Sequence, residues 1–188
     1  MQFFHKDIVV EVPNSVYFPR EDSLTLAEII EKISTNGKNV LDMGCGSGFL
    51  AILMARNKAI VTAADINPEA IAIAEKNAAI NGINITVIHS NLFENIRDKF
   101  DLIVFNPPYL PFGPYDLQWS GGIDIIERFL KDAKSHLKEH GKIIFLASTL
   151  TAQEKEITAL IEKNGYKYAV LTRKKVPWEE LVVFEAKL

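Results

Sequence analysis

The chain has 188 residues, of which 48% are hydrophobic, so it is long enough for one well-packed core and too short for two domains of ordinary size. Its net charge of -3 excludes the overall basic field that draws proteins onto nucleic acids. The single cysteine, Cys45, excludes an internal disulfide and a zinc site built from several cysteines, and it fits a reducing compartment.

The first residues lack the apolar stretch of a signal peptide, and no segment is long enough to span a bilayer. We therefore expect a cytoplasmic protein with no membrane partner. We expect residues 1–36 to form a leader and a first helix, and residues 37–188 to form the core of a single domain. Residues 1–12 form either an added strand or a flap beside the substrate, and both alternatives stay open.

The first helix is predicted within residues 23–33, where apolar side chains recur at helical spacing, and Asn36-Gly37 is expected to end it. Apolar runs and amphipathic stretches then alternate, as a parallel sheet with crossover helices requires. Extended segments are expected at residues 39–43, 60–65, 83–89, 101–105 and 142–147. Helices are expected at residues 49–57, 68–81, 123–139 and 151–164.

Proline and glycine positions support these boundaries. Pro68 stands at the first position of a predicted helix, where its missing N–H costs little. Gly82, Gly141 and Gly165 each follow a predicted helix, where a left-handed residue is favoured.

The last part of the chain has a different pattern. Residues 166–176 and 181–188 are both extended, and only Pro177-Trp178-Glu179-Glu180 separates them, so they should pair in antiparallel fashion. The predicted fold is α/β, a doubly wound and mostly parallel sheet of seven strands with an antiparallel C-terminal hairpin.

A glycine-rich loop follows the first core strand. Gly44, Gly46 and Gly48 alternate directly before a helix, which suits a backbone that turns sharply and approaches a ligand closely. A tight strand-to-helix turn is the alternative explanation, but such a turn rarely needs three alternating glycines. Asp65 ends the next strand about 20 residues later, where an acid can bind the ribose hydroxyls of a nucleoside.

Two residues decide between the nucleoside ligands. Phe49 stands where a dinucleotide-binding loop needs a glycine, which disfavours NAD. Asp42, just before the loop, would repel a pyrophosphate, whereas it suits a ligand that carries an ammonium group.

This pattern, Asp-x-Gly-x-Gly-x-Gly followed by an acid at the end of the next strand, resembles motifs I and II of class I S-adenosylmethionine-dependent methyltransferases. The resemblance implies that the glycine loop lies against the methionine part of the cofactor, that Asp42 lies near its amino group and that Asp65 binds its ribose. It implies further cofactor contacts from Ile66, Asn91, Leu92 and Asn106. Asn91 replaces the Asp that the family often has, and its carbonyl oxygen can still accept from the adenine amino group.

The run Asn106-Pro107-Pro108-Tyr109 ends the fourth core strand, at the carboxyl edge where ligands bind in such sheets. The Asn106 side-chain oxygen and the Pro107 carbonyl can each accept one N–H of a planar amino group, which orients a poorly nucleophilic nitrogen. The two prolines hold the backbone extended, and Tyr109 can stack on the flat substrate group. These four residues are the predicted catalytic set; an Asn-Pro turn with a core tyrosine is the alternative.

The segment 17–26, Tyr-Phe-Pro-Arg-Glu-Asp-Ser-Leu-Thr-Leu, resembles the Tyr-x-Pro-x-Glu-Asp-Ser/Thr segment of HemK-like protein glutamine methyltransferases, in particular their short archaeal and eukaryotic branch. Residues 65–70 and Trp119-Ser120-Gly121-Gly122 also match that family. By this resemblance Ser23 contacts the cofactor. Ile125 departs from the pattern, because the family usually has glycine there.

The resemblance implies methylation of the glutamine in the Gly-Gly-Gln tripeptide of a class I translation release factor, with S-adenosylmethionine as cofactor. The alternatives are N6-adenine methylation of DNA, methylation of a protein lysine or a small molecule, and a cofactor-binding subunit without catalysis. A duplex base would have to be flipped out and held by a recognition domain, and this chain has no room for one.

Three further features have alternative explanations. His136 and His140 have metal-ligand spacing on a predicted helix, but no third ligand is apparent, so we predict no metal. The loop 111–115 with Trp119 forms either a lid or a peptide-binding rim. Residues 173–175, Arg-Lys-Lys, are more typical of a solvated strand end than of a nucleic-acid patch.

The third core strand should lie at an edge of the sheet, with Ile83, Ile85 and Val87 alternating on one face. Archaeal and eukaryotic members of the resembled family work with a small zinc-binding activator protein. The hypothesis is that such an activator docks on this edge.

Overall fold

The computed structural model describes residues 1–108 and 122–188. Seven strands form one sheet in the order β5-β4-β3-β6-β7-β9-β8. The strands β5, β4, β3, β6 and β7 run parallel, and β9 pairs antiparallel with both β7 and β8. The strands are β3 (Asn39–Met43), β4 (Ile60–Asp65), β5 (Thr86–His89), β6 (Phe100–Phe105), β7 (Leu137–Ser148), β8 (Lys167–Val176) and β9 (Glu179–Lys187). The predicted strand arrangement, including the C-terminal hairpin, is confirmed.

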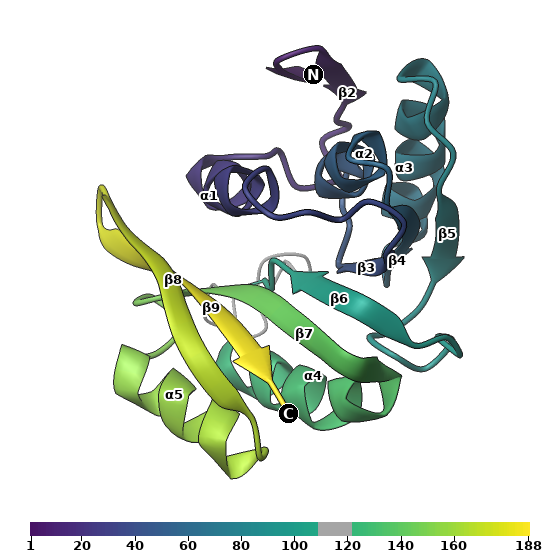
Figure 1. Ribbon diagram of the computed structural model, residues 1–188. Coiled ribbons are helices and arrows are strands. Elements are labelled where there is room, and N and C mark those ends of the chain that lie inside the picture. The colour runs from purple at the N-terminus through teal and green to yellow at the C-terminus, as the bar shows by residue number, and fades with distance from the viewer. Residues whose placement is uncertain (109–121) are drawn as a thin grey trace.

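Helices cover both faces of this sheet (Figure 1). α1 (Glu21–Ile30), α2 (Phe49–Arg56) and α3 (Pro68–Ile80) lie on one face, and α4 (Gly122–Ala133) and α5 (Glu154–Lys163) lie on the other. Successive side chains of β6 point to opposite faces of the sheet. Leu102 and Val104 pack with the first group of helices, whereas Ile103 and Phe105 pack with the second. This period of two follows from the pleat of a strand and explains why β6 is an almost continuous apolar run.

The leader forms its own antiparallel hairpin, β1 (Gln2–His5) and β2 (Ile8–Glu11), and adds no strand to the main sheet. Two asparagines one turn apart hold this hairpin: Asn77 lies on α3, and Asn81 is the C-cap residue of α3. Asn77 accepts from the Glu11 N–H and donates to the Glu11 carbonyl, both at 2.8 Å, and Asn81 makes the same pair of bonds with Val9 at 3.1 and 2.7 Å. These amides pair with the backbone N–H and carbonyl groups on the outer edge of β2, as a neighbouring strand would.

The predicted helix at 123–139 is wrong in its last part. α4 ends at Ala133, a 3-10 turn covers Lys134–His136, and β7 begins at Leu137. His136 and His140 therefore do not share a helix. Pairing of Leu137 with Phe100, followed by an irregularity in the register, overrides the local helical pattern.

Gly141 is also misassigned by the sequence, since it lies inside β7 and not after a helix. A Cβ atom at this position would stand 2.8 Å from the Phe100 carbonyl oxygen and 2.9 Å from that of Lys138. Glycine is needed here because the backbone of Phe100 and that of Lys138 both lie too close to this position to leave room for a side chain. Gly82 and Gly165 do follow helices with positive φ, and Pro68 is the first residue of α3, as predicted.

Three predicted boundaries shift. α1 spans Glu21–Ile30, so it begins two residues before the predicted segment and ends well before Asn36-Gly37. α5 begins at Glu154 and not at residue 151. β5 is limited to Thr86–His89, and Ile83 and Ile85 precede it; together with Val87 they pack, partly buried, on the core. In the part of the chain that the structure describes, no helix is both long and apolar enough to cross a membrane.

Candidate active site

Three loops meet at the carboxyl edge of the parallel strands. Met43 of β3 lies opposite Phe105 of β6 and Ala64 of β4, so the segments that follow these residues emerge side by side. Contact between two of them is close, since a Cβ atom on Gly44 would stand 3.5 Å from the Phe105 ring and 3.9 Å from the Asn106 carbonyl oxygen. The structure thus brings the glycine loop, Asp65 and Asn106 together, as the order of motifs predicts.

The three loop glycines all have positive φ, at 65, 52 and 78° for Gly44, Gly46 and Gly48. Gly48 also permits close helix packing, because a Cβ atom there would stand 3.1 Å from the Ala74 Cβ of α3. A side chain at Gly48 would therefore conflict with both the backbone conformation and the α2–α3 contact. The loop leaves the sheet edge with backbone facing the site.

Asp65 fixes the loop from the neighbouring strand. Its carboxylate accepts from the backbone N–H of Gly46 and of Asn67, each at 2.9 Å. Burial raises the pKa of the Asp65 carboxyl, and the N–H donors of Asn67 and Gly46 partly oppose that rise. A carboxylate has about four lone-pair positions, so acceptor capacity remains for hydroxyl groups of a ligand. Ile66 follows directly and is 60% exposed.

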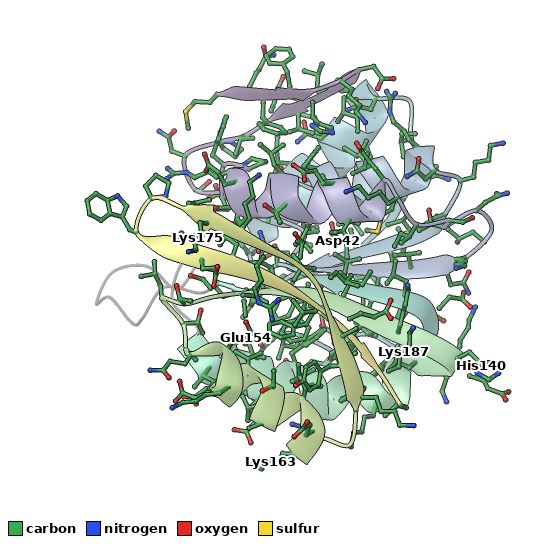
Figure 2. All side chains as sticks on the ribbon, turned by 60° about the vertical axis from the view of Figure 1, so that its left-hand side comes forward. Asp42, His140, Glu154, Lys163, Lys175 and Lys187 are labelled. Atoms are coloured by element: carbon green, nitrogen blue, oxygen red, sulfur yellow. The ribbon has the colours of Figure 1, made fainter. Side chains whose placement is uncertain are left out.

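Asp42 lies in the interior. Figure 2 shows it near the centre of the molecule, with the other labelled residues towards the periphery. Its side chain is 2% exposed, and its Oδ2 atom has no hydrogen-bond partner among the described residues. Burial, with a smaller contribution from the nearby Asp65 charge, raises the pKa of the Asp42 carboxyl to about 7. The Ala51 backbone N–H donates to this carboxyl and partly opposes the rise, but the buried Oδ2 atom would be stabilised by a cationic ligand.

Asn91 and Leu92 follow β5 at the same edge. The Asn91 amide donates to Glu94 at 2.8 Å, which turns its nitrogen away and keeps its oxygen as the acceptor for a ligand. Leu92 is buried, with a φ of 49°, and its carbonyl accepts from the Ser90 hydroxyl at 2.7 Å. A hydrogen bond from the Ser90 N–H to the Asp65 carbonyl ties this loop to the preceding one.

Asn106 is oriented by a residue that sequence reasoning missed. Its Nδ2 group donates to the Asp22 carboxylate at 2.9 Å and lies 3.5 Å from the Ser23 hydroxyl. Its Oδ1 atom is buried and has no partner among the described residues. A carboxylate only accepts, so Asp22 allows only one orientation of the amide, with the nitrogen towards Asp22 and the oxygen away from it.

Asp22 gathers four donors and is 2% exposed. Besides Asn106, it accepts from the Tyr17 hydroxyl at 2.9 Å, the Ser23 N–H at 2.7 Å and the Ser23 hydroxyl at 3.3 Å. It stands in the first turn of α1, where a negative charge is favoured. The only signal for Asp22 in the sequence was its position directly before Ser23. The spacing of residues in that segment does not reveal that Asp22 lies close to Asn106.

The leader covers the glycine loop. Asn67, the N-cap of α3, donates its side-chain N–H to the Ser15 carbonyl at 3.0 Å. Val16 is buried and would lie 3.9 Å from a Cβ atom on Gly46. The segment between β2 and α1 therefore connects the two sides of the site.

The remaining predicted site residues differ in what the structure describes. Pro107 is buried and Pro108 is partly buried beside Asn106. Tyr109, the loop 111–115 and Trp119 lie outside the described residues. The described residues contain no cluster of three or more potential metal ligands.

The sequence matches the methyltransferase small domain family over residues 21–175. The chain belongs to this family. It is 37% identical to a proposed protein N5-glutamine methyltransferase of Methanocaldococcus jannaschii, with 95% of both chains covered. It is 35% identical to the release factor glutamine methyltransferase of Lactococcus lactis over 73% of this chain, which spans 58% of that enzyme. These matches identify an S-adenosylmethionine-dependent N-methyltransferase.

Solved structures also resemble this methyltransferase over most of both chains. One of them is the E. cuniculi Mtq2-Trm112 complex, responsible for the methylation of the eRF1 translation termination factor. The TM-score is 0.77 at 25% identity, with 92% of this chain and 98% of that chain covered.

The edge of the methyltransferase suits S-adenosylmethionine in three respects. The buried Asp42 oxygen lacks a donor that an ammonium group would provide. The Asp65 carboxylate keeps acceptor positions for ribose hydroxyls. The glycine loop offers backbone without side chains next to Asn106.

Proposed function

We propose that this methyltransferase methylates the side-chain amide nitrogen of glutamine in the Gly-Gly-Gln motif of a translation release factor. The observation that carries the proposal is the Asn106 amide, whose oxygen is buried without a partner among the described residues while Asp22 holds its nitrogen. Such an oxygen is an acceptor for the N–H of a planar amide. The names of the Methanocaldococcus and Lactococcus relatives support the same substrate class.

An amide nitrogen needs to be oriented and stabilised by acceptors because its lone pair is delocalised into the carbonyl group. Asn106 Oδ1 and the Pro107 carbonyl would accept its two N–H groups and so hold the amide plane in one orientation. Both acceptors become more favourable as the nitrogen gains positive charge in the transition state. When bound, S-adenosylmethionine supplies an electrophilic methyl group. The proton then leaves the alkylated nitrogen readily, so a strong base is not required.

We assign the cofactor to the residues at the carboxyl edge. The loop of Gly44, Gly46 and Gly48 and the buried Asp42 would hold the methionine part, with Ser23 on its other side. Asp65 would bind the ribose. The adenine would lie against the exposed Ile66, with Leu92 backbone nearby and the Asn91 oxygen as acceptor for the amino group.

Binding of S-adenosylmethionine should strengthen as pH rises towards 7. The bound ammonium requires an ionised Asp42, whose pKa in the free protein is about 7. Below this value each binding event must release a proton, so Kd should rise about tenfold from pH 7.5 to pH 6. Isothermal titration calorimetry in buffers of different ionisation enthalpy measures both Kd and the released proton.

Asp42→Asn is the control for this prediction, since it should bind the cofactor weakly at both pH values and release no proton. In the unliganded protein the raised pKa of Asp42 makes folding stability change with pH in the direction opposite to cofactor binding. The folded chain retains the Asp42 proton that the unfolded chain loses near its usual 3.8, so stability should fall as pH rises from about 4 to 7. A Kd that does not change between pH 6 and 7.5 would contradict the assignment of Asp42.

The substrate is tested by mass spectrometry of a purified archaeal or eukaryotic-type release factor after incubation with the enzyme and S-adenosylmethionine. We expect a single added methyl on the Gly-Gly-Gln peptide and none on a Gln-to-Ala release factor. A DNA oligonucleotide in a parallel reaction tests N6-adenine methylation, and mapping every modified residue tests lysine. Methylation of either one instead of glutamine overturns the proposal.

A small activator protein is proposed to dock on β5. This strand ends the sheet, and its backbone pairs on one side only, with β4, among the described residues. The partner in the E. cuniculi Mtq2-Trm112 complex supports a two-protein assembly. We propose a zinc-binding partner that adds a strand near residues 83–87. Unchanged solubility and activity on co-expression, with no complex on gel filtration, would contradict it.

A further inference from the structure

The turn between β8 and β9 contains a tryptophan that local structure does not explain. Val176 pairs with Glu179, so the turn consists of Pro177 and Trp178. Trp178 has a φ of 78°, in the left-handed region that turns normally reserve for glycine or asparagine. Its side chain is 95% exposed, so packing within the described chain does not compensate for the unfavourable backbone. A residue that breaks a local rule without an internal gain indicates a function.

This turn lies at the edge of the sheet that carries the active site. β7 runs parallel to β6, so its Ser148 end lies at the same edge as Asn106, and β9 starts there because it runs antiparallel to β7. Thr149 fastens the start of β9 to the end of β7: its N–H donates to the Glu180 carbonyl at 3.0 Å, and its hydroxyl accepts from the Glu180 N–H at 2.9 Å. Figure 2 shows Lys175 close to this end of the hairpin and Lys187 at the other end.

We propose that Trp178, together with the neighbouring Leu150, binds the folded methyl-acceptor protein outside its methylated tripeptide. Leu150 follows Thr149 and is 42% exposed; we call the two residues the Trp178 rim. β9 lies two strands from β6, a sideways distance of roughly 10 Å. A protein that inserts a loop at Asn106 therefore presents its surrounding surface to the rim. Tryptophan is the residue type that most often carries binding energy at protein interfaces. This inference rests on the proposed function.

The charges near the rim favour a protein over a nucleic acid. Arg173 binds Glu154 through two hydrogen bonds, and Lys174 lies 3.7 Å from Glu28. Two acids, Glu179 and Glu180, directly follow Trp178. Two of the three cations in the run 173–175 thus pair with carboxylates, and Lys175 lies opposite Glu180 in the register of β8 and β9. Phosphate binding beside a stacking tryptophan requires free cations.

The test compares two acceptors for Trp178→Ala and Trp178→Gly: the intact release factor and a short peptide that contains Gly-Gly-Gln. We expect KM for the intact factor to rise about tenfold or more in both variants, with KM for the peptide and kcat for either acceptor unchanged. Phe4→Ala is the matched control, because Phe4 is 63% exposed on the leader hairpin, away from this edge, and its loss should leave both KM values unchanged.

Trp178→Gly also separates binding from folding. Glycine adopts the observed φ without strain, so the melting temperature should stay the same or rise while KM rises. Three results would each overturn the proposed role of the Trp178 rim. They are an unchanged KM for the intact factor, an equal rise in KM for the peptide, and competition by single-stranded RNA that Trp178→Ala abolishes. If the wild-type enzyme methylates neither acceptor, the proposed function is refuted. The proposal that a release factor binds the rim is then refuted as well.

Discussion

Asn106→Ala is expected to lower kcat for glutamine methylation by about 10²- to 10³-fold, while Kd for S-adenosylmethionine stays within about threefold of the wild type. The substitution removes the buried Oδ1 acceptor that the described residues leave without a partner. Without it the substrate amide loses one of its two orienting hydrogen bonds and the stabilisation of its developing charge. Single-turnover methylation measures the rate, and calorimetry measures cofactor binding.

A control for Asn106→Ala is Asn95→Ala at the same edge of the sheet. Asn95 follows β5, is exposed, and donates its side-chain N–H to the His89 carbonyl, so it lacks an acceptor directed at a substrate. We expect its rate to match that of the wild type. If Asn106→Ala weakens cofactor binding as much as it slows methyl transfer, Asn106 supports the cofactor site and is not a substrate acceptor.

Asp22→Asn is expected to lower kcat by about 10- to 100-fold with little change in KM or in cofactor affinity. Asp22 is a positioning residue, since it acts through Asn106. An asparagine at position 22 can donate as well as accept, so the Asn106 amide is no longer held in one orientation. In the fraction of molecules where it flips, an N–H group faces the substrate amide and repels it. Steady-state kinetics with release factor measures the separation of kcat from KM.

Tyr17→Phe provides the matched control for Asp22, because it removes a donor to the same carboxylate and leaves the 2.9 Å bond between Asp22 and Asn106 in place. Its kcat should remain within about threefold of the wild type. Melting temperatures identify any loss of folding, since Asp22 is buried. If both variants lose activity equally, or if Asp22→Asn only unfolds more easily, the positioning role is refuted.

The three acids of the site differ in whether the sequence alone reveals their place in it. Asp42 and Asp65 stand at fixed distances from a glycine loop, so their neighbourhood follows from the parallel strands that hold them. Asp22 lies 84 residues from Asn106, and no periodicity links the two positions. Only the packing of α1 over the edge of the sheet creates that contact.

The same distinction applies to the errors in secondary structure. Residues 137–140 follow a helix and contain no helix-breaking residue, so local pattern extends the helix through them. In the fold Leu137 pairs with Phe100 of β6, the register then shifts, and His140 takes a φ of 62°. The hydrogen bonds of the neighbouring strand decide the outcome, and these partners are distant in sequence.

The sequence by itself determined the alternation of strands and helices, the antiparallel end of the sheet, and the order of the glycine loop, Asp65 and the Asn-Pro-Pro segment. These depend on local periodicity and on backbone conformations that only certain residues adopt. The tertiary structure alone decided the orientation of the Asn106 amide, the raised pKa of Asp42, the docking of the leader by Asn77 and Asn81, and the position of Trp178 at the carboxyl edge of the parallel strands. Each of these arises from burial or from contacts between segments far apart in the chain, where the physical cause is proximity and not pattern.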